Sequence, residues 1–252
     1  MIVPVLLVVP ARVGSTRLPR KPLQLLGGAP LVARVVERAR EVPGVDHLVV
    51  ATDSQEIAEA LVPWGVTVVM TDPGHESGTD RVAEVARRPE YANCDIVVNL
   101  QGDEPFMPID AVAGSIARVQ KGDAIGTAAA PLDPAHRHEP ALVKVVTDAA
   151  GRALYFSRAA IPHLRDAADP LNVRWWQHLG VYAYRRDVLL HVTMLPVCDL
   201  ERAERLEQLR ALDAGLSIGV AFLDRPAPAG IDTPADLAAA EVRWRDFAEV
   251  PS

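Results

Sequence analysis

The chain is predicted to fold as a three-layer α/β sandwich around a largely parallel sheet. Short apolar segments alternate with amphipathic segments over the first half of its 252 residues. The apolar segments have the length of strands, whereas the amphipathic segments repeat their apolar residues at helical spacing. This alternation is typical of a parallel sheet whose two faces are covered by helices.

The first half supplies most of the expected elements. The expected strands are segments 2–9, 47–52, 67–70, 95–100 and 124–130. Pro30 stands in the first turn of a helix that buries one apolar face. Asp53 is predicted to cap the next helix, with Glu56 three residues further on. Two more helices are expected over about 79–88 and 108–120.

The alternation changes after residue 131. The segment VKVVTDAAGRALYFSR (143–158) reads as a hairpin with DAAG as its turn, and HLGVYAY (178–184) as another strand. One charged helix is expected over 200–215, ending at Gly215. The strand SIGVAFL, the loop GIDTP and a helix from Pro234 follow. We expect one domain, 1–252, with an excursion at about 131–215.

Composition limits the possible partners. The formal net charge of −7 argues against general nucleic-acid binding, so any anionic ligand needs a local basic cluster. Cys94 and Cys198 lack the spacing of a metal or redox motif, which fits a reducing cytoplasm. The apolar first residues have no basic residues before them and are too short to span a bilayer. We therefore expect a soluble, unprocessed, cytoplasmic protein with no membrane partner.

A loop rich in basic residues, here called the basic loop, follows the first strand. The segment PARVGSTRLPRKP (10–22) carries three arginines and a lysine next to Gly14 and Ser15. Basic side chains and backbone N–H groups together suit a triphosphate. The alternative is a solvated loop that happens to be basic. The position after a buried strand favours the phosphate, because ligands bind beyond the carboxyl ends of such strands.

Two carboxylates occupy loops far apart in the sequence. Asp103 lies in QGDEP, after the strand DIVVNL, and Asp232 lies in GIDTP. Carboxylate oxygens are suitable ligands for a hard divalent cation. Each aspartate is also an ordinary residue for a turn or a helix start. Only their meeting in space would favour a metal site.

The excursion contains polar residues among apolar neighbours, and each could be a satisfied, half-buried polar side chain. Glu207 and Gln208 are expected in the middle of a helix, where adjacent positions cannot share one face. The residues of this group are Arg158, His178, Tyr182, Glu207 and Gln208.

Taken together, these segments resemble the cytidylyltransferases that activate 3-deoxy-manno-octulosonate (Kdo). The motifs that carry the resemblance occur in the family's order over nearly the whole chain, and the ordered set is far more specific than any one motif. HLGVYAY followed by LEQLRAL also separates this family from its sialic-acid-activating relatives. The motifs are PARVGSTRLPRKPL, ATD, HESGTDR, VVNLQGDEP, VKVV, ALYFSRAAIP, HLGVYAYRR, LERAERLEQLRAL and GIDTPADL.

The resemblance implies a fold like that of nucleotide-diphosphosugar transferases, a homodimer, and a Mg²⁺-dependent reaction for lipopolysaccharide biosynthesis. CTP and Kdo would give CMP-Kdo and pyrophosphate by direct displacement, and the excursion would contribute sugar-binding and dimer contacts. The implied catalytic residues are Arg12, Lys21, Asp103 and Asp232, with the two aspartates as metal ligands. The implied CTP-binding residues are Arg12, Ser15, Lys21, Ser77, Gly78, Arg81 and Gln101. The implied sugar-binding residues are Gln101, Arg158, His178, Tyr182, Glu207 and Gln208.

Two features depart from the family pattern. Arg20 replaces the glycine of R-L-P-G-K-P, which costs about 1 kcal/mol if that position needs a positive φ; alternatively, Arg20 adds a cation near the phosphates. The segment 163–177 matches poorly, which leaves open a related sugar acid such as an amino-substituted octulosonate. A non-catalytic nucleotide-binding regulator would be expected to lose one metal carboxylate. A glycosyltransferase would be expected to carry a D-x-D motif, which QGDEP lacks.

Overall fold

The computed structural model describes residues 3–14, 17–165 and 173–248, and its backbone divides into two compact units. The first unit comprises Met1–Ile109 with Pro228–Ser252, and the second comprises Asp110–Ala227. The expected excursion lies inside the second unit. That the whole chain forms one domain stays a prediction.

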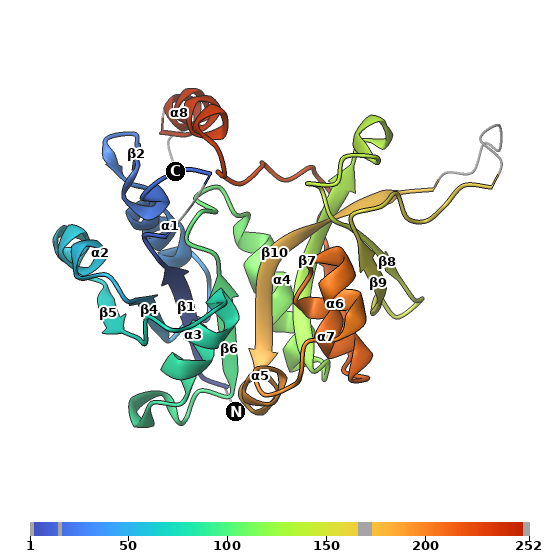
Figure 1. The fold of residues 1–252 in the computed structure, drawn as a ribbon, viewed down its shortest axis with the longest axis horizontal. Helices are drawn as coiled ribbons and strands as arrows, with labels where there is room; N and C mark the ends of the chain where they lie inside the picture. Colours follow the sequence, from blue (N-terminus) through green and yellow to red (C-terminus); the bar gives the residue numbers. More distant parts are fainter. Residues whose placement is uncertain (1–2, 15–16, 166–172, 249–252) are drawn as a thin grey trace. The chain divides into compact units, whose positions relative to one another are not determined.

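The first unit contains a parallel sheet with the strand order β6-β1-β4-β5 (Figure 1). Every residue of β1 (Val5–Ala11) is buried, as expected for a central strand covered on both faces. Helices α1 and α3 both pack against β1. The other strands are β4 (His47–Thr52), β5 (Thr67–Met70) and β6 (Ile96–Leu100), and a short hairpin consists of β2 (Leu25–Leu26) and β3 (Ala29–Pro30). The helices are α1 (Leu31–Arg40), α2 (Gln55–Ala60), α3 (Gly78–Ala86) and α8 (Pro234–Ala248), with one-turn helices η1 (Lys21–Leu23), η2 (Val62–Trp64) and η3 (Pro89–Tyr91).

The second unit has a mixed sheet. Strand β7 (Ile125–Leu132) pairs in parallel with β11 (Ile218–Phe222) and antiparallel with β10 (Trp175–Arg185). The hairpin of β8 (Lys144–Thr147) and β9 (Ala153–Ser157) joins β10 through β8. The helices are α4 (Ile109–Gln120), α5 (Arg186–Val192), α6 (Asp199–Glu204) and α7 (Gln208–Asp213), with η4 (Pro134–His136). The α/β prediction is confirmed, and the parallel pairings are concentrated in the first unit.

Two local predictions were wrong. The expected helix 200–215 is two helices, because Arg205 takes a left-handed conformation with φ 54° that ends α6. Ser54, not Asp53, caps α2, and its hydroxyl accepts a hydrogen bond from the Ile57 N–H at 3.4 Å. The Asp53 carboxylate instead pairs with Arg81.

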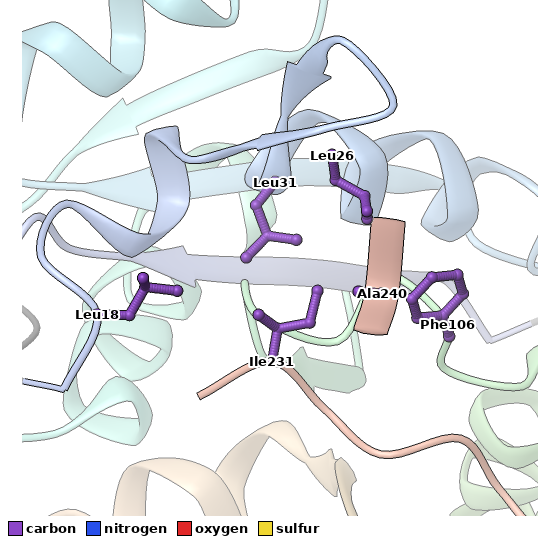
Figure 2. Close-up of a cluster of buried hydrophobic side chains, with 6 residues drawn as sticks. All are labelled: Leu18, Leu26, Leu31, Phe106, Ile231 and Ala240. Carbon is purple, nitrogen blue, oxygen red and sulfur yellow. The ribbon is translucent and has the colours of Figure 1, made fainter. Parts of the chain in front are cut away.

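An apolar cluster in the first unit connects segments that are distant in the sequence (Figure 2). Leu237 and Trp244 of α8 pack against its edge. The cluster joins the loop after β1, the start of α1, the loop after β6 and the segment before α8. Its buried members are Leu18, Leu26, Leu31, Phe106, Ile231 and Ala240.

Within the described ranges, no helix combines the length and the apolar character needed to cross a bilayer.

Candidate functional site

The ammonium group of Lys21 bridges two carboxylates in the first unit. Its Nζ lies 2.5 Å from Oδ2 of Asp103 and 2.7 Å from Oδ1 of Asp232. Lys21 opens η1, Asp103 follows β6, and Asp232 precedes α8. Burial lowers the pKa of Lys21, but the two carboxylates outweigh it and leave that pKa raised. The structure therefore brings together two aspartates 129 positions apart in the sequence (232 − 103).

The apolar cluster explains why these three residues meet. Leu18 stands three residues before Lys21, Phe106 three residues after Asp103, and Ile231 directly before Asp232. Burying the three apolar side chains together fixes the backbones that carry the charges. A backbone hydrogen bond from Ile231 N–H to the Asp103 carbonyl, 3.2 Å long, joins two of the loops directly.

Glu104 adds a third carboxyl group beside this pair. Burial, together with the charges of Asp103 and Asp232, raises the pKa of Glu104 to about 8, although Lys21 opposes the shift. Its side chain lies against Gly230, where a Cβ atom would come within 2.5 Å of Oε1. Gly230 is therefore required for the close approach of the two loops.

The basic loop lies over the same carboxylates. Arg17 Nη2 is 3.0 Å from Asp232 Oδ1, with two thirds of its side chain exposed. Arg12 is exposed and reaches the Glu76 carbonyl at 3.5 Å. Arg20 has φ 53°, so this position takes the left-handed conformation that glycine adopts without strain. The Arg20 side chain pairs with Glu56. Ser15 lies outside the described residues.

The predicted nucleotide loop is ordered by its own helix. The Ser77 hydroxyl accepts a hydrogen bond from Asp80 N–H at 3.1 Å and caps α3, of which Gly78 is the first residue. A Cβ atom on Gly78 would lie 3.5 Å from Gln101 Oε1, so the loop packs closely on Gln101. Arg81 is buried and donates to Thr71 and, at 3.2 Å, to Asp53. Its guanidinium thus supports the protein rather than facing outward.

Gln101 belongs to a small amide pair at the end of β6. Its Nε2 donates to Asn99 Oδ1 at 3.1 Å. Asn99 Nδ2 is buried and has no hydrogen-bond partner within the described part of the chain.

In the second unit, Arg158 is held by the protein's own carbonyl groups. Its guanidinium donates to the carbonyls of Glu204 at 2.8 Å and Pro140 at 3.0 Å. Its carbonyl accepts from Lys144 Nζ at 2.6 Å, and Lys144 is itself fully buried. Burial lowers the pKa of Lys144, which also binds the carbonyls of Glu139 and Leu142. Arg158 is therefore the centre of a structural network.

His178 and Tyr182 are neighbouring rings on β10. Their centroids are 5.3 Å apart, and Phe156 meets His178 edge-on at 4.9 Å. Burial alone lowers the pKa of His178 to about 3. Burial also raises the pKa of Tyr182 well above its ordinary value, with a contribution from the charges of Tyr184 and Glu207.

Glu207 and Gln208 stand at the start of α7, so their expected place in the middle of one helix was wrong. Gln208 Nε2 is buried and lacks a hydrogen-bond partner among the residues that the structure describes. An unsatisfied buried amide donor costs about 1–3 kcal/mol, which favours a ligand or water at this position.

Sequence reasoning missed several residues of both regions. Arg17 belongs to the basic loop but was not separated from its neighbours, and only its distance to Asp232 distinguishes it. Asp53 was interpreted as a cap, because pairing with Arg81 across 28 positions leaves no local signal. Lys144 belongs to the VKVV motif, but the sequence alone assigned no role to this lysine.

The described residues contain no group of three or more histidine, cysteine, aspartate or glutamate side chains arranged for a metal ion. Two carboxylates that already hold a cationic group nevertheless fit Mg²⁺, which proteins often bind through one or two carboxylates together with substrate phosphates.

Comparisons with known proteins show the family to which the chain belongs. The family model described as "Cytidylyltransferase" matches residues 6–218. A protein of Gemmatimonas aurantiaca named 3-deoxy-manno-octulosonate cytidylyltransferase is 53% identical over 96% of this chain and 94% of its own length. A protein of the same name from Xanthomonas campestris pv. campestris is 49% identical over 93% and 97%. A solved CMP:2-keto-3-deoxy-manno-octonic acid synthetase in complex with CTP superposes with a TM-score of 0.90 and 40% identity, over 97% of this chain and 99% of that one.

Proposed function

Because the chain belongs to the 3-deoxy-manno-octulosonate cytidylyltransferases, we propose that it joins CTP to Kdo at the site built by Lys21, Asp103 and Asp232. The products are CMP-Kdo and pyrophosphate. The role of the product in lipopolysaccharide biosynthesis and a cytoplasmic location belong to the same proposal. The observation that carries it is the bridge from one ammonium group to two aspartates.

The reaction brings together two anionic reactants. The sugar acid carries a carboxylate and CTP carries a triphosphate, so charge must be neutralised before the two can approach. The sugar's anomeric hydroxyl forms a new bond to the α-phosphorus while the bond from that phosphorus to the bridging oxygen of pyrophosphate breaks. The hydroxyl proton passes to solvent water, and no protein nucleophile is required.

Asp103 and Asp232 are the groups that would hold Mg²⁺. When bound there, Mg²⁺ supplies a positive charge and Lewis acidity beside the phosphate oxygens. Both aspartates now share the Lys21 ammonium, which supports their affinity for a cation. Once released from the aspartates, Lys21 can bind a phosphate oxygen of CTP.

The basic loop provides further cations for the triphosphate. Arg12 and Arg17 are exposed and have long side chains that can reach phosphate oxygens. Together with Lys21 they stabilise the charge that develops on the departing pyrophosphate. Ser77 and Gly78 order the neighbouring loop, and Gln101 supports it at the end of β6.

The second unit supplies the proposed sugar-binding groups. The buried Gln208 amide is evidence for a ligand at this position, because its Nε2 lacks a hydrogen-bond partner in the described part of the protein. His178 and Tyr182 form an aromatic wall, and the charge of Glu207 acts on Tyr182. Arg158 orders the segments around this region through its carbonyl contacts. We also propose that the protein is a homodimer.

Asp103→Asn tests the metal role directly. Pyrophosphate release from CTP, Kdo and Mg²⁺ is expected to fall at least a hundredfold, because the amide carries no charge to hold the cation. Asp95→Asn is the matched control, since Asp95 is exposed and precedes β6, whereas Asp103 follows that strand. Retention of most of the activity by Asp103→Asn would refute the assignment.

A further inference from the structure

Thr127 lies on β7 and is completely buried beneath the aromatic wall of the second unit. Its Oγ1 is 2.7 Å from the Val181 carbonyl and 3.3 Å from the Leu179 carbonyl. The same oxygen is 3.0 Å from Nε2 of His178. One hydroxyl group therefore touches two carbonyls and one imidazole nitrogen.

The number of protons decides which nitrogen of His178 carries hydrogen. A threonine hydroxyl has one proton to donate, and a carbonyl oxygen can only accept. An oxygen–oxygen distance of 2.7 Å is a normal hydrogen bond, so the Thr127 proton points to Val181. The hydroxyl then offers only lone pairs to His178, and Nε2 must donate. Nδ1 is left with a free electron pair.

The backbone of β10 creates this arrangement through a bulge. Leu179 pairs with Ala128, but the next pairing joins Tyr182 to Thr127, so three steps on β10 oppose one step on β7. Bulges interrupt the ladder and redirect neighbouring groups. Here the carbonyls of Leu179 and Val181 both turn toward the Thr127 hydroxyl, whose single proton is donated to Val181.

The surroundings of His178 keep the ring neutral and fixed. Phe156 packs edge-on against it and Tyr182 lies beside it. Its depressed pKa agrees with a neutral ring. Among the residues that the structure describes, Nδ1 has no hydrogen-bond partner, so its electron pair is available to a ligand.

We propose that Thr127 is a positioning residue that fixes His178 as the Nε2–H tautomer, so that Nδ1 accepts a hydrogen bond from a hydroxyl group of the sugar acid. This proposal rests on the proposed sugar-binding role of the second unit. An electron pair attracts a hydroxyl proton and repels a carboxylate oxygen. His178 therefore selects which side of the sugar acid faces β10, with its carboxylate directed elsewhere.

Nitrogen-15 NMR of the histidine side chains tests the tautomer in the ligand-free protein. The His178 resonances, assigned by comparison with His178→Gln, are expected to show a protonated Nε2 and an unprotonated Nδ1. Thr127→Ser keeps the hydroxyl and should preserve this pattern. Thr127→Val removes the hydroxyl with little change of shape and should give a mixture of tautomers. A protonated Nδ1 in the unchanged protein, or an unchanged pattern in Thr127→Val, overturns the proposal.

Steady-state kinetics tests the consequence. Thr127→Val is expected to raise KM for the sugar acid at least tenfold while KM for CTP changes less than twofold, and Thr127→Ser should remain near the unchanged protein. Equal effects on both KM values, or none, would overturn the specificity role. A protein that releases no pyrophosphate from CTP and Kdo contradicts the proposed function instead, while the NMR result still decides the tautomer.

Discussion

At the scale of single residues, the buried ring of His178 makes stability depend on pH. Its folded pKa of about 3 lies below the ordinary histidine value of 6.5. Between these values the unfolded chain binds a proton that the folded chain does not, so unfolding becomes easier as pH falls. We expect His178→Gln to lose less stability than the unchanged protein between pH 6.5 and pH 4. Urea unfolding at several pH values measures this.

His191→Gln is the control for that experiment, because His191 is exposed on α5. It should keep the pH dependence of the unchanged protein. Parallel loss of stability in His178→Gln and the unchanged protein would show that the buried ring is not responsible.

Arg20 combines a backbone cost with a weak surface ion pair. A left-handed conformation at a non-glycine residue costs about 1–2 kcal/mol, and exposed ion pairs such as Arg20–Glu56 contribute roughly 0.2–1 kcal/mol. In a Glu56→Gln background, we expect Arg20→Gly to raise the free energy of unfolding by about 0.5–1 kcal/mol, since glycine relieves the backbone but frees the unfolded chain.

Arg20→Ala in the same background separates the two effects, because alanine keeps its Cβ and the backbone cost. This variant should show no increase in the free energy of unfolding measured by chemical denaturation. A gain as large as that of the glycine variant would contradict the role assigned to φ.

At the scale of elements, α8 packs against the hairpin of β2 and β3 (Figure 1). Gly27 lies so close to the Trp244 ring that a Cβ atom there would be 2.1 Å from Nε1. The Arg34 guanidinium stacks over the same ring at 4.3 Å, and Glu241 accepts from Gly27 N–H at 2.8 Å. Since Asp232 lies only two residues before α8, this anchor supports the carboxylate.

Trp244→Ala is expected to loosen the anchor. The loss in unfolding free energy should be about 2 kcal/mol, below the usual cost for a fully buried tryptophan, because Trp244 is only partly buried. The Mg²⁺ concentration for half-maximal activity should rise several-fold. Trp176→Ala is the matched control, because Trp176 lies on β10 of the second unit, where it packs against Phe222. A similar rise in both variants would contradict the positioning role.

The elements also show what local sequence patterns can predict. Strands 47–52 and 67–70 have the predicted bounds, and α8 begins at Pro234 as expected, because apolar runs and a first-turn proline are local signals. The break at Arg205 has no such signal, since arginine favours a helix. Its carbonyl accepts a hydrogen bond from the distant Arg158 at 3.4 Å, which no local pattern reveals. Ser54 and Asp53 are both good caps, and the distant Arg81 decides between them.

At the scale of the whole molecule, the sequence predicted which loops of the first unit carry the charged residues better than how those residues meet. Parallel strands bring their carboxyl ends to one edge, which made the loops after β1 and β6 candidates for one site. That Lys21 bridges Asp103 and Asp232 depends on an apolar cluster assembled from both ends of the chain. No spacing in the sequence encodes such a meeting. The bulge that turns Val181 toward Thr127 is likewise a property of two paired strands.

The homodimer is a prediction for the whole molecule. Sedimentation equilibrium should give twice the chain mass of 27.2 kDa at micromolar concentration. A mass equal to one chain across the measured range would contradict it.

Metal binding tests the central claim most directly. Mn²⁺ can replace Mg²⁺ in such oxygen sites and is visible by electron paramagnetic resonance. In the presence of a non-hydrolysable CTP analogue, the unchanged protein should bind Mn²⁺, whereas Asp103→Asn and Asp232→Asn should each weaken that binding at least tenfold. Glu76→Gln, an exposed acid outside the carboxylate pair, should leave it unchanged. Mn²⁺ affinity that stays the same after either aspartate is replaced would contradict the account.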